Sequence, residues 1–171
     1  MQNYDNAYGK YKKNRKLIDI NIIESFEVSS NSNVAIIIPH RNRLDHLQQF
    51  IDHFNELDMH DNNLDVYVID QNNADPFNRG ILLNIGFEIA RNTKKYDRYI
   101  FHDVDSYPEQ KLFDLYFSHF DKIIHFASPS LEYKYTNYSF FGGIVGFNEN
   151  DFKKINGFSN TFFGHDGEDD S

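Results

Sequence analysis

The chain has 171 residues, of which 40% are hydrophobic and 16% aromatic, and it contains no Cys and no Trp. This length and apolar content predict one globular domain with its own core, and they exclude a disordered chain. The formal net charge of -9 argues against a nucleic-acid partner, because proteins that bind nucleic acid normally present a basic surface.

The missing cysteines exclude a disulfide framework and a thiolate metal site. No apolar run approaches the roughly 18 residues that span a bilayer, and the N-terminus lacks the apolar region of a signal peptide. We therefore expect a soluble, cytoplasmic protein without a membrane span.

Residues 1–33 are rich in Asn, Lys and Tyr and include the basic run KYKKNRK. The alternation in IDINIIESFEV (residues 18–28) allows one edge strand, and the polar SSNSN follows it. We predict that residues 1–33 form a polar, basic arm and linker, and that residues 34–171 form the folded domain.

Alternating strands and helices begin at Val34. The continuous apolar run VAIII, ended by Pro39, is typical of a strand buried on both faces of a parallel sheet. A helix is predicted over residues 44–57, with apolar residues at Leu44, Leu47, Phe50, Ile51, Phe54 and Leu57. A second is predicted over residues 78–92, with apolar residues at Ile81, Leu82, Ile85 and Ile89.

Further strands are predicted over residues 64–70 and 98–103, and this order of strands and helices is typical of βαβ units. We therefore expect an α/β fold with a mostly parallel sheet flanked by helices. A helix over residues 110–120, strands over 122–127 and 139–147, and a short helix from Asn148 to Gly157 complete the prediction. Asn148 is placed to cap that last helix, and Gly157 to stop it.

Polar segments follow three of the predicted strands: PHRNR, DQNNADPFNR and DVDS. Ligands of open α/β sheets bind beyond the carboxyl ends of the strands, so these segments should meet at one edge. If DVDS is extended, Asp103 and Asp105 point to the same side. Two such carboxylates suit Mg²⁺ or Mn²⁺ shared with a substrate diphosphate, and an ordinary turn is the alternative.

Arg41, Arg43 and Arg79 lie in the same segments and could grip phosphate, although a helix-capping role is open for each of them. Asp70 either contacts a base or ribose or lies in a surface turn. The terminal GHDGEDD offers a carboxylate that could act as a general base beside flexible glycines. A solvated acidic terminus is the alternative.

Four segments occur in the order and spacing found in one enzyme family: VAIIIPHRNR, FNRGILLNIGFEIA, FHDVDSYP and the stretch from FFGGIVGF to GEDD. From Val34 to Asp170 the chain resembles the β-1,4-galactosyltransferases, which are inverting, metal-dependent glycosyltransferases. The resemblance implies a GT-A, Rossmann-like catalytic domain. That domain would transfer galactose or N-acetylgalactosamine from a UDP-sugar to a hydroxyl of a saccharide acceptor. The alternative is a UDP-sugar-binding module with weak or no activity, either a truncated relative or part of a larger assembly.

The resemblance also implies roles for individual residues. The UDP-sugar would be held by Pro39, Arg41, Arg43, Phe77, Arg79, Asp103, Val104 and Gly143. Asp105, with Asp103, would ligate Mn²⁺ or Mg²⁺. Asp169 would be the catalytic base with Glu168 beside it, and the acceptor would meet His165, Gly167, Asp169 and Asp170.

The chain departs from the family pattern at three places. His165-Asp166-Gly167 stands where the family usually has Trp-Gly-Gly, which removes an aromatic platform for the sugar. Phe140 replaces the usual Tyr of YFGG, which leaves galactose and N-acetylgalactosamine both open as donors. Family members also continue past GEDD with a further metal ligand, usually His. We therefore expect Asp105 to share its metal with water, the diphosphate or a residue such as His165.

Overall fold

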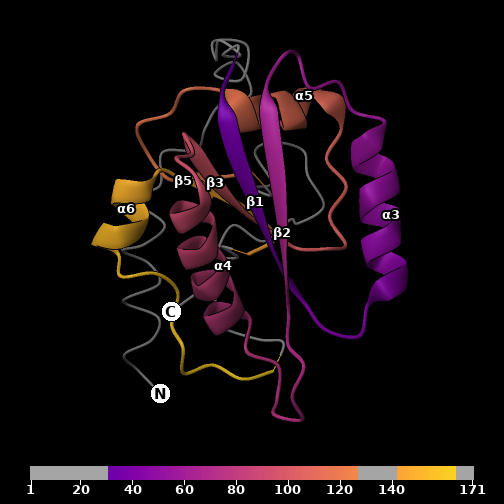
Figure 1. Cartoon of the computed structure of the whole chain (residues 1–171), viewed down its shortest axis with the longest axis vertical. Helices are drawn as coiled ribbons and strands as arrows, with labels where there is room; N and C mark the ends of the chain where they lie inside the picture. Colours follow the sequence, from indigo (N-terminus) through magenta and orange to yellow (C-terminus); the bar gives the residue numbers. More distant parts are fainter. Residues whose placement is uncertain (1–30, 127–141, 165–171) are drawn as a thin grey trace, which may run out of the picture.

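The computed structural model describes residues 31–126 and 142–164. Five strands in these residues form one mixed sheet in the order β2-β1-β3-β5-β4, with helices packed around it (Figure 1). The strands are β1 (Asn33–His40), β2 (Asn63–Asp70), β3 (Arg98–His102), β4 (Ile124–His125) and β5 (Ile144–Phe147). The helices are α3 (Leu44–Asn55), α4 (Arg79–Thr93), α5 (Gln110–Asp114) and α6 (Glu149–Lys154), with a 3₁₀ turn, η1, at Leu115–Phe117. The α/β prediction is confirmed.

Strand β1 is the centre of the parallel part of the sheet, with β2 on one side and β3 on the other. It is buried from Val34 to its end, as its continuous apolar sequence predicts. The prediction that Pro39 ends the strand is wrong, because β1 continues to His40. Pairing with β3 stops at Ile37, so at Pro39 the strand has a neighbour on one side only. A residue without an N–H is tolerated at such a place.

The sheet closes with antiparallel strands. β5 runs antiparallel to β3, and β4 runs antiparallel to β5. Both are shorter than predicted, since β4 has two residues and β5 begins at Ile144. The three long parallel strands therefore carry the central part of the fold.

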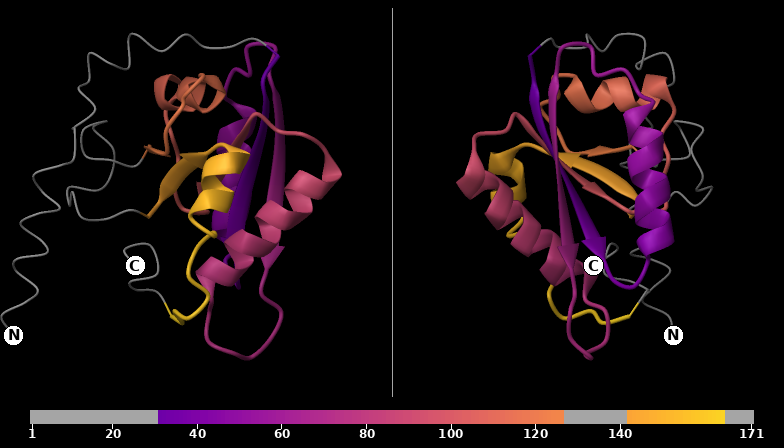
Figure 2. Two further views of the ribbon diagram at one scale, coloured as in Figure 1. Left: turned by 90° about the vertical axis from the view of Figure 1, so that its left-hand side faces the viewer. Right: turned by 45° about the vertical axis from the view of Figure 1, so that its right-hand side comes forward.

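Helices cover both faces of the sheet, as the right-hand view of Figure 2 shows. Side chains of a strand alternate between its two faces, so β1 supplies both cores. Ile36 packs with Phe50 of α3 and with the residues of α5 and η1. Ile37 packs with Leu83 of α4 and with residues beside α6. This arrangement is an α/β/α sandwich with two aromatic-rich cores.

The buried face of helix α4 agrees with the predicted one only in part, since Leu82 is buried as predicted. Ile85 and Ile89 are 44% and 46% exposed, whereas the buried side includes Leu83, Gly86 and Phe87. A Cβ at Gly86 would lie 2.4 Å from Cγ2 of Ile37. The helix backbone thus comes closest to the sheet where it has no side chain, and this contact sets which face is buried. Hydrophobicity alone did not distinguish the two faces.

The other helix predictions hold with shorter bounds. In α3, Phe50 is buried and Leu47 and Phe54 pack against the same core, whereas Leu44 and Ile51 are exposed. The helix predicted over residues 110–120 ends as η1 at Phe117. No helix among the described residues has the length and apolar character needed to cross a membrane.

Helix α6 has the ends that its sequence predicts. The Asn148 side chain accepts a hydrogen bond from the Asp151 N–H at 2.9 Å, which caps the first turn. Gly157 has φ +72°, and its N–H donates to the Phe152 carbonyl. Glycine adopts this left-handed conformation without strain, so the helix stops there.

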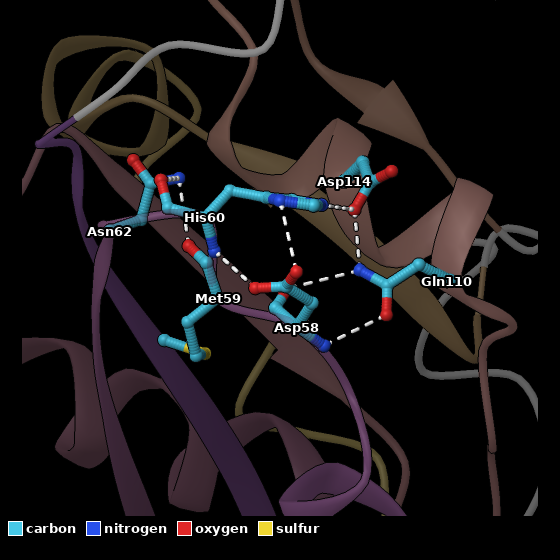
Figure 3. Close-up of polar contacts among 6 residues, drawn as sticks. All are labelled: Asp58, Met59, His60, Asn62, Gln110 and Asp114. Atoms are coloured by element: carbon cyan, nitrogen blue, oxygen red, sulfur yellow. Dashed lines mark hydrogen bonds and ion pairs between the residues drawn. The ribbon is translucent and has the colours of Figure 1, made fainter.

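A polar cluster joins the loop between α3 and β2 to α5 (Figure 3). The two ring nitrogens of His60 lie 3.3 Å from carboxylate oxygens of Asp58 and of Asp114. Gln110 donates to the Asp58 carbonyl at 3.0 Å and to Asp114 at 2.6 Å. The loop precedes β2, so this cluster fixes α5 at the amino edge of the sheet, away from the carboxyl ends of the strands.

The connections reverse direction around β1. The chain passes from β1 through α3 to β2, and then from β2 through α4 to β3 on the other side of β1. Helices α3 and α4 therefore leave the sheet toward opposite faces. The carboxyl ends of β1 and β3 form the switch point at which open α/β sheets bind ligands.

Candidate functional site

The polar segments that follow β1, β2 and β3 meet at the carboxyl edge, as predicted. Two ion pairs, Arg43 with Asp105 and Arg79 with Asp103, and the hydrogen-bonded contact of His40 with Asp70 connect them. Each pair joins residues from two different strand ends. The fold thus brings charged side chains of both signs together at the switch point.

The Arg79–Asp103 pair is largely buried. Nε and Nη2 of Arg79 lie 3.0 Å and 2.9 Å from Oδ1 of Asp103, and the two side chains are 7% and 24% exposed. Arg79 is the first residue of α4, which Asn78 caps by accepting the Ile81 N–H at 2.9 Å. The Asp103 N–H donates at 2.8 Å to the carbonyl of Gly143. Asp103 therefore connects the start of α4 to the backbone that leads into β5.

Asp105 lies in a turn, and the prediction of an extended DVDS segment is wrong. Strand β3 ends at His102, and the Ser106 N–H donates to the Asp103 carbonyl at 3.2 Å. The Asp105 side chain is 33% exposed, and its Oδ2 lies 3.4 Å from Nη1 of Arg43. That distance is long for a hydrogen bond. The two carboxylates thus differ, because Asp103 holds Arg79 whereas Asp105 is accessible to an added cation.

These carboxylates suit a divalent metal ion only in a shared site. No group of three or more His, Cys, Asp or Glu side chains in residues 31–126 and 142–164 could hold a metal ion. Asp105 and Asp103 offer hard oxygen ligands, which Mn²⁺ and Mg²⁺ prefer. Mg²⁺ sites commonly combine one or two carboxylates with water and substrate phosphates. The residues present fit a metal held in that way.

The remaining residues expected at the nucleotide have varied surroundings. Arg41 donates to the Asp75 carbonyl at 2.5 Å and so holds the loop between β2 and α4. Pro39 is buried within β1. Val104 is 4% exposed and packs in the core on the α3 side, so its backbone is the part that could face a ligand. Phe77 is half-buried, and its carbonyl accepts the Gly164 N–H at 2.8 Å.

The pair formed by His40 and Asp70 completes this edge. Nδ1 of His40 lies 2.7 Å from Oδ1 of Asp70. The imidazole is buried, whereas Asp70 is 56% exposed. Asp70 therefore lies at the surface, and it also holds a buried ring at the end of β1.

The expected acceptor and base residues lie outside the described part of the chain. They are His165, Gly167, Glu168, Asp169 and Asp170. Phe140 also lies outside it. Their roles stay predictions.

His102 is a residue of this edge that sequence analysis did not single out. Its ring is fully buried, with Nδ1 2.7 Å from the Asp103 carbonyl and Nε2 3.0 Å from the Tyr116 hydroxyl. Burial lowers the pKa of His102 to about 4, so the imidazole is neutral at pH 7. Because a carbonyl only accepts hydrogen bonds, Nδ1 carries the proton and Nε2 accepts from Tyr116. The sequence feature that could have singled out His102 is its position at the end of an apolar strand, directly before the aspartates.

The fold is that of known glycosyltransferases. The catalytic domain of Drosophila β1,4-galactosyltransferase 7, solved in complex with xylobiose, superposes with a TM-score of 0.70 and 32% identity, covering 81% of this chain and 58% of that chain. A mutant of that protein, in complex with manganese, UDP-Gal and xylobiose, superposes with a TM-score of 0.68 and 31% sequence identity. A mannosyltransferase from Pyrobaculum calidifontis, in complex with GDP-Man and Mn²⁺, shares the fold alone, with a TM-score of 0.55 and 13% identity. The sheet and its switch-point edge thus define a GT-A glycosyltransferase fold.

Sequence comparison assigns the family within that class. Two family models match the chain. The model for the N-terminal region of glycosyl transferase group 7 matches residues 6–118, and the model for the N-terminal domain of galactosyltransferase matches residues 122–171. Rat β-1,4-galactosyltransferase 6 is 41% identical over 141 residues, which are 80% of this chain and 36% of that protein. Human β-1,4-galactosyltransferase 4 is 38% identical over 146 residues, 84% of this chain and 42% of that protein. The chain belongs to the β-1,4-galactosyltransferase family, as the resemblance predicted, and spans less than half the length of these relatives.

Proposed function

We propose that this chain carries the donor site of a glycosyltransferase that moves galactose, or N-acetylgalactosamine, from a UDP-sugar to a saccharide hydroxyl with inversion. The observation that carries the proposal is the meeting of Arg43 with Asp105 and of Arg79 with Asp103 at the switch point. Family membership supports the reaction. We assign the catalytic domain to residues 34–171 and regard residues 1–33 as an arm.

The donor site has one fixed and one adaptable arginine. Arg79 is buried and held by Asp103, so it provides positive charge in a set position at the start of α4. Arg43 is 44% exposed, and its contact with Asp105 is long, so its guanidinium can turn to a diphosphate. We assign Phe77, Pro39, Arg41 and the backbones of Val104 and Gly143 to the same UDP-sugar site.

Asp105, with Asp103, would hold Mn²⁺ or Mg²⁺ at this site. The ion, when bound, neutralises charge that develops on the leaving diphosphate. A relative of known structure that binds manganese and UDP-Gal supports this assignment. The basic side chains supply the same kind of stabilisation from fixed positions in the protein.

We propose Asp169 as the general base, with Glu168 beside it. A carboxylate at that position would take the proton from the acceptor hydroxyl as the oxygen attacks the sugar carbon opposite the diphosphate, which gives inversion. His165, Gly167 and Asp170 are proposed acceptor contacts. The xylobiose bound by the Drosophila relative supports a saccharide acceptor.

A narrower function is a UDP-sugar-binding module with weak or no transfer activity. Both functions predict metal-dependent UDP binding. They differ in whether an acceptor sugar causes turnover.

A transfer assay separates the two functions. UDP release from UDP-galactose is measured with and without Mn²⁺, for the parent chain and for Asp169→Asn, across a panel of acceptor sugars. We expect acceptor-dependent release by the parent, and about a 10²- to 10⁴-fold lower rate for Asp169→Asn, the usual contribution of a general base. Asp121→Asn, which changes an exposed carboxylate, is the matched control. UDP binding without release would favour the module, and unchanged release by Asp169→Asn would exclude that residue as the base.

A further inference from the structure

A segment that follows α6 lies along the amino-terminal half of α4. It comprises residues 157–164, here named the strap, and Figures 1 and 2 show it passing from α6 to the start of α4. The strap has no helix or strand hydrogen bonds of its own. It is held instead by burial of the Phe158 ring in the core on the α4 side and by hydrogen bonds to residues at and within α4.

Asn84 makes the principal attachment. Its Nδ2 donates to the Phe158 carbonyl at 2.9 Å, and its Oδ1 accepts the Phe158 N–H at 3.0 Å. The amide thus pairs with both backbone groups of one strap residue, as a neighbouring strand would. Nδ2 also donates to Oδ1 of Asn160 at 2.7 Å. Three hydrogen bonds from one side chain thus tie the strap to the helix beside the buried Phe158 ring.

Glycines in both the helix and the strap leave space for the contact between them. A Cβ at Gly80 would lie 2.1 Å from the Ser159 carbonyl oxygen, and a Cβ at Gly157 would lie 2.5 Å from Oδ1 of Asn84. Asn78, which caps α4, also donates from Nδ2 to the Asn160 carbonyl at 2.9 Å. The contact is therefore close along its length and is matched to this helix.

The strap ends at the donor edge. The Gly164 N–H donates to the Phe77 carbonyl at 2.8 Å, two residues before Arg79. The acidic motif assigned to acceptor and base begins with the next residue of the chain. One helix end thus carries the donor residues and also the last described anchor before that motif.

We propose that Asn84 is a positioning residue that fixes the strap, and with it Gly164, to the end of α4 that carries the donor residues Phe77 and Arg79. This inference rests on the proposed function, since it concerns the placing of Asp169 against the donor. Asn84 itself touches no reacting group. Its loss should impair the orientation of the base and leave donor binding intact, and a displacement of about 1 Å is enough to lower a rate roughly 100-fold.

A tryptophan reporter tests the attachment without any ligand. The chain has no Trp, and Phe163 in the strap is 59% exposed, so Phe163→Trp introduces a single fluorophore. We expect Asn84→Ala in this background to lower the anisotropy of Trp emission and to increase its quenching by acrylamide. The control is Asn92→Ala, because Asn92 is an exposed asparagine of the same helix whose Nδ2 bonds the Glu88 carbonyl of its own helix. Equal anisotropy in the two variants would overturn the proposal.

Kinetics with the native Phe163 tests the consequence. For Asn84→Ala we expect an unchanged Kd for UDP with Mn²⁺ and a kcat about 10- to 100-fold lower, whereas Asn92→Ala matches the parent. Asn84→Asp is the second variant. It keeps the acceptor for the Phe158 N–H and removes the donor to the Phe158 carbonyl, so its kcat should also fall at unchanged Kd.

The outcomes are distinguishable. An unchanged kcat in both Asn84 variants would overturn the positioning role. A parallel loss of UDP affinity, kcat and thermal stability in both would show that Asn84 is merely structural, and this would also overturn it. If the parent chain binds no UDP, the proposed function fails, and the anisotropy measurement alone decides whether Asn84 fixes the strap.

Discussion

The buried imidazole of His102 should make the stability of this protein depend on pH. The rings of Phe50 and Tyr116 pack against it, and burial lowers its pKa from 6.5 to about 4. In the unfolded chain the ring regains its ordinary pKa of about 6.5. Between these values the unfolded state binds a proton that the folded state does not bind, so the free energy of unfolding falls as the pH falls. Well above pH 6.5 neither state is protonated, and this contribution is constant.

The pKa difference sets the magnitude. Protonation of the unfolded chain lowers the free energy of unfolding by about 2 kcal/mol between pH 7 and pH 5, and by roughly 3 kcal/mol once pH 4 is reached. Urea unfolding of the metal-free protein at pH 7 and pH 5 measures the change. His102→Gln removes the titrating group while the other ionisable residues remain, so the parent should lose about 2 kcal/mol more than the variant over this interval. Equal losses in the two proteins would refute a buried neutral His102.

Three further substitutions test particular contacts. Asp105→Ala should abolish metal-dependent UDP binding while changing the free energy of unfolding by less than about 1 kcal/mol in urea titrations, because its ion pair with Arg43 is long and partly exposed. Gly86→Ala should destabilise by about 1–3 kcal/mol in the same assay, despite the better helix propensity of Ala, since its Cβ would lie 2.4 Å from Ile37. Gly80→Ala should displace the strap and lower the anisotropy of the Trp reporter at position 163, because its Cβ would lie 2.1 Å from a strap carbonyl oxygen. A normal stability for Gly86→Ala, or a normal anisotropy for Gly80→Ala, would contradict the packing described.

The order of strands and helices could be predicted because it depends on local patterns. The run VAIII is buried on both faces, and Asn148 caps α6 as its side-chain chemistry requires. The buried face of α4 depends on a contact that no local pattern contains, the approach of Gly86 to β1. The end of β1 was mispredicted for a similar reason. Pro39 is compatible with a strand only because pairing with β3 has already stopped.

In the candidate site, too, some features could be predicted from the sequence and others depend on tertiary contacts. The rule that ligands bind beyond strand ends located Arg43, Arg79, Asp103 and Asp105 at one edge, without any pairwise information. Which arginine pairs with which aspartate depends on the turn at residues 103–106, and an extended segment was the wrong assumption. The neutral state of His102 follows from complete burial, a property of the assembled core. Sequence can suggest such a residue by its position, but the pKa depends on its neighbours.

The central claim is that residues of the carboxyl edge bind a UDP-sugar with a divalent metal. Calorimetric titration of UDP into the chain, with and without Mn²⁺, tests it most directly when it is repeated with Asp105→Ala and with Asp121→Asn as the control. We predict saturable binding that requires Mn²⁺ in the parent and in Asp121→Asn, and no such binding in Asp105→Ala. Failure of the parent chain to bind UDP in the presence of Mn²⁺, or equal binding by Asp105→Ala, would contradict the account.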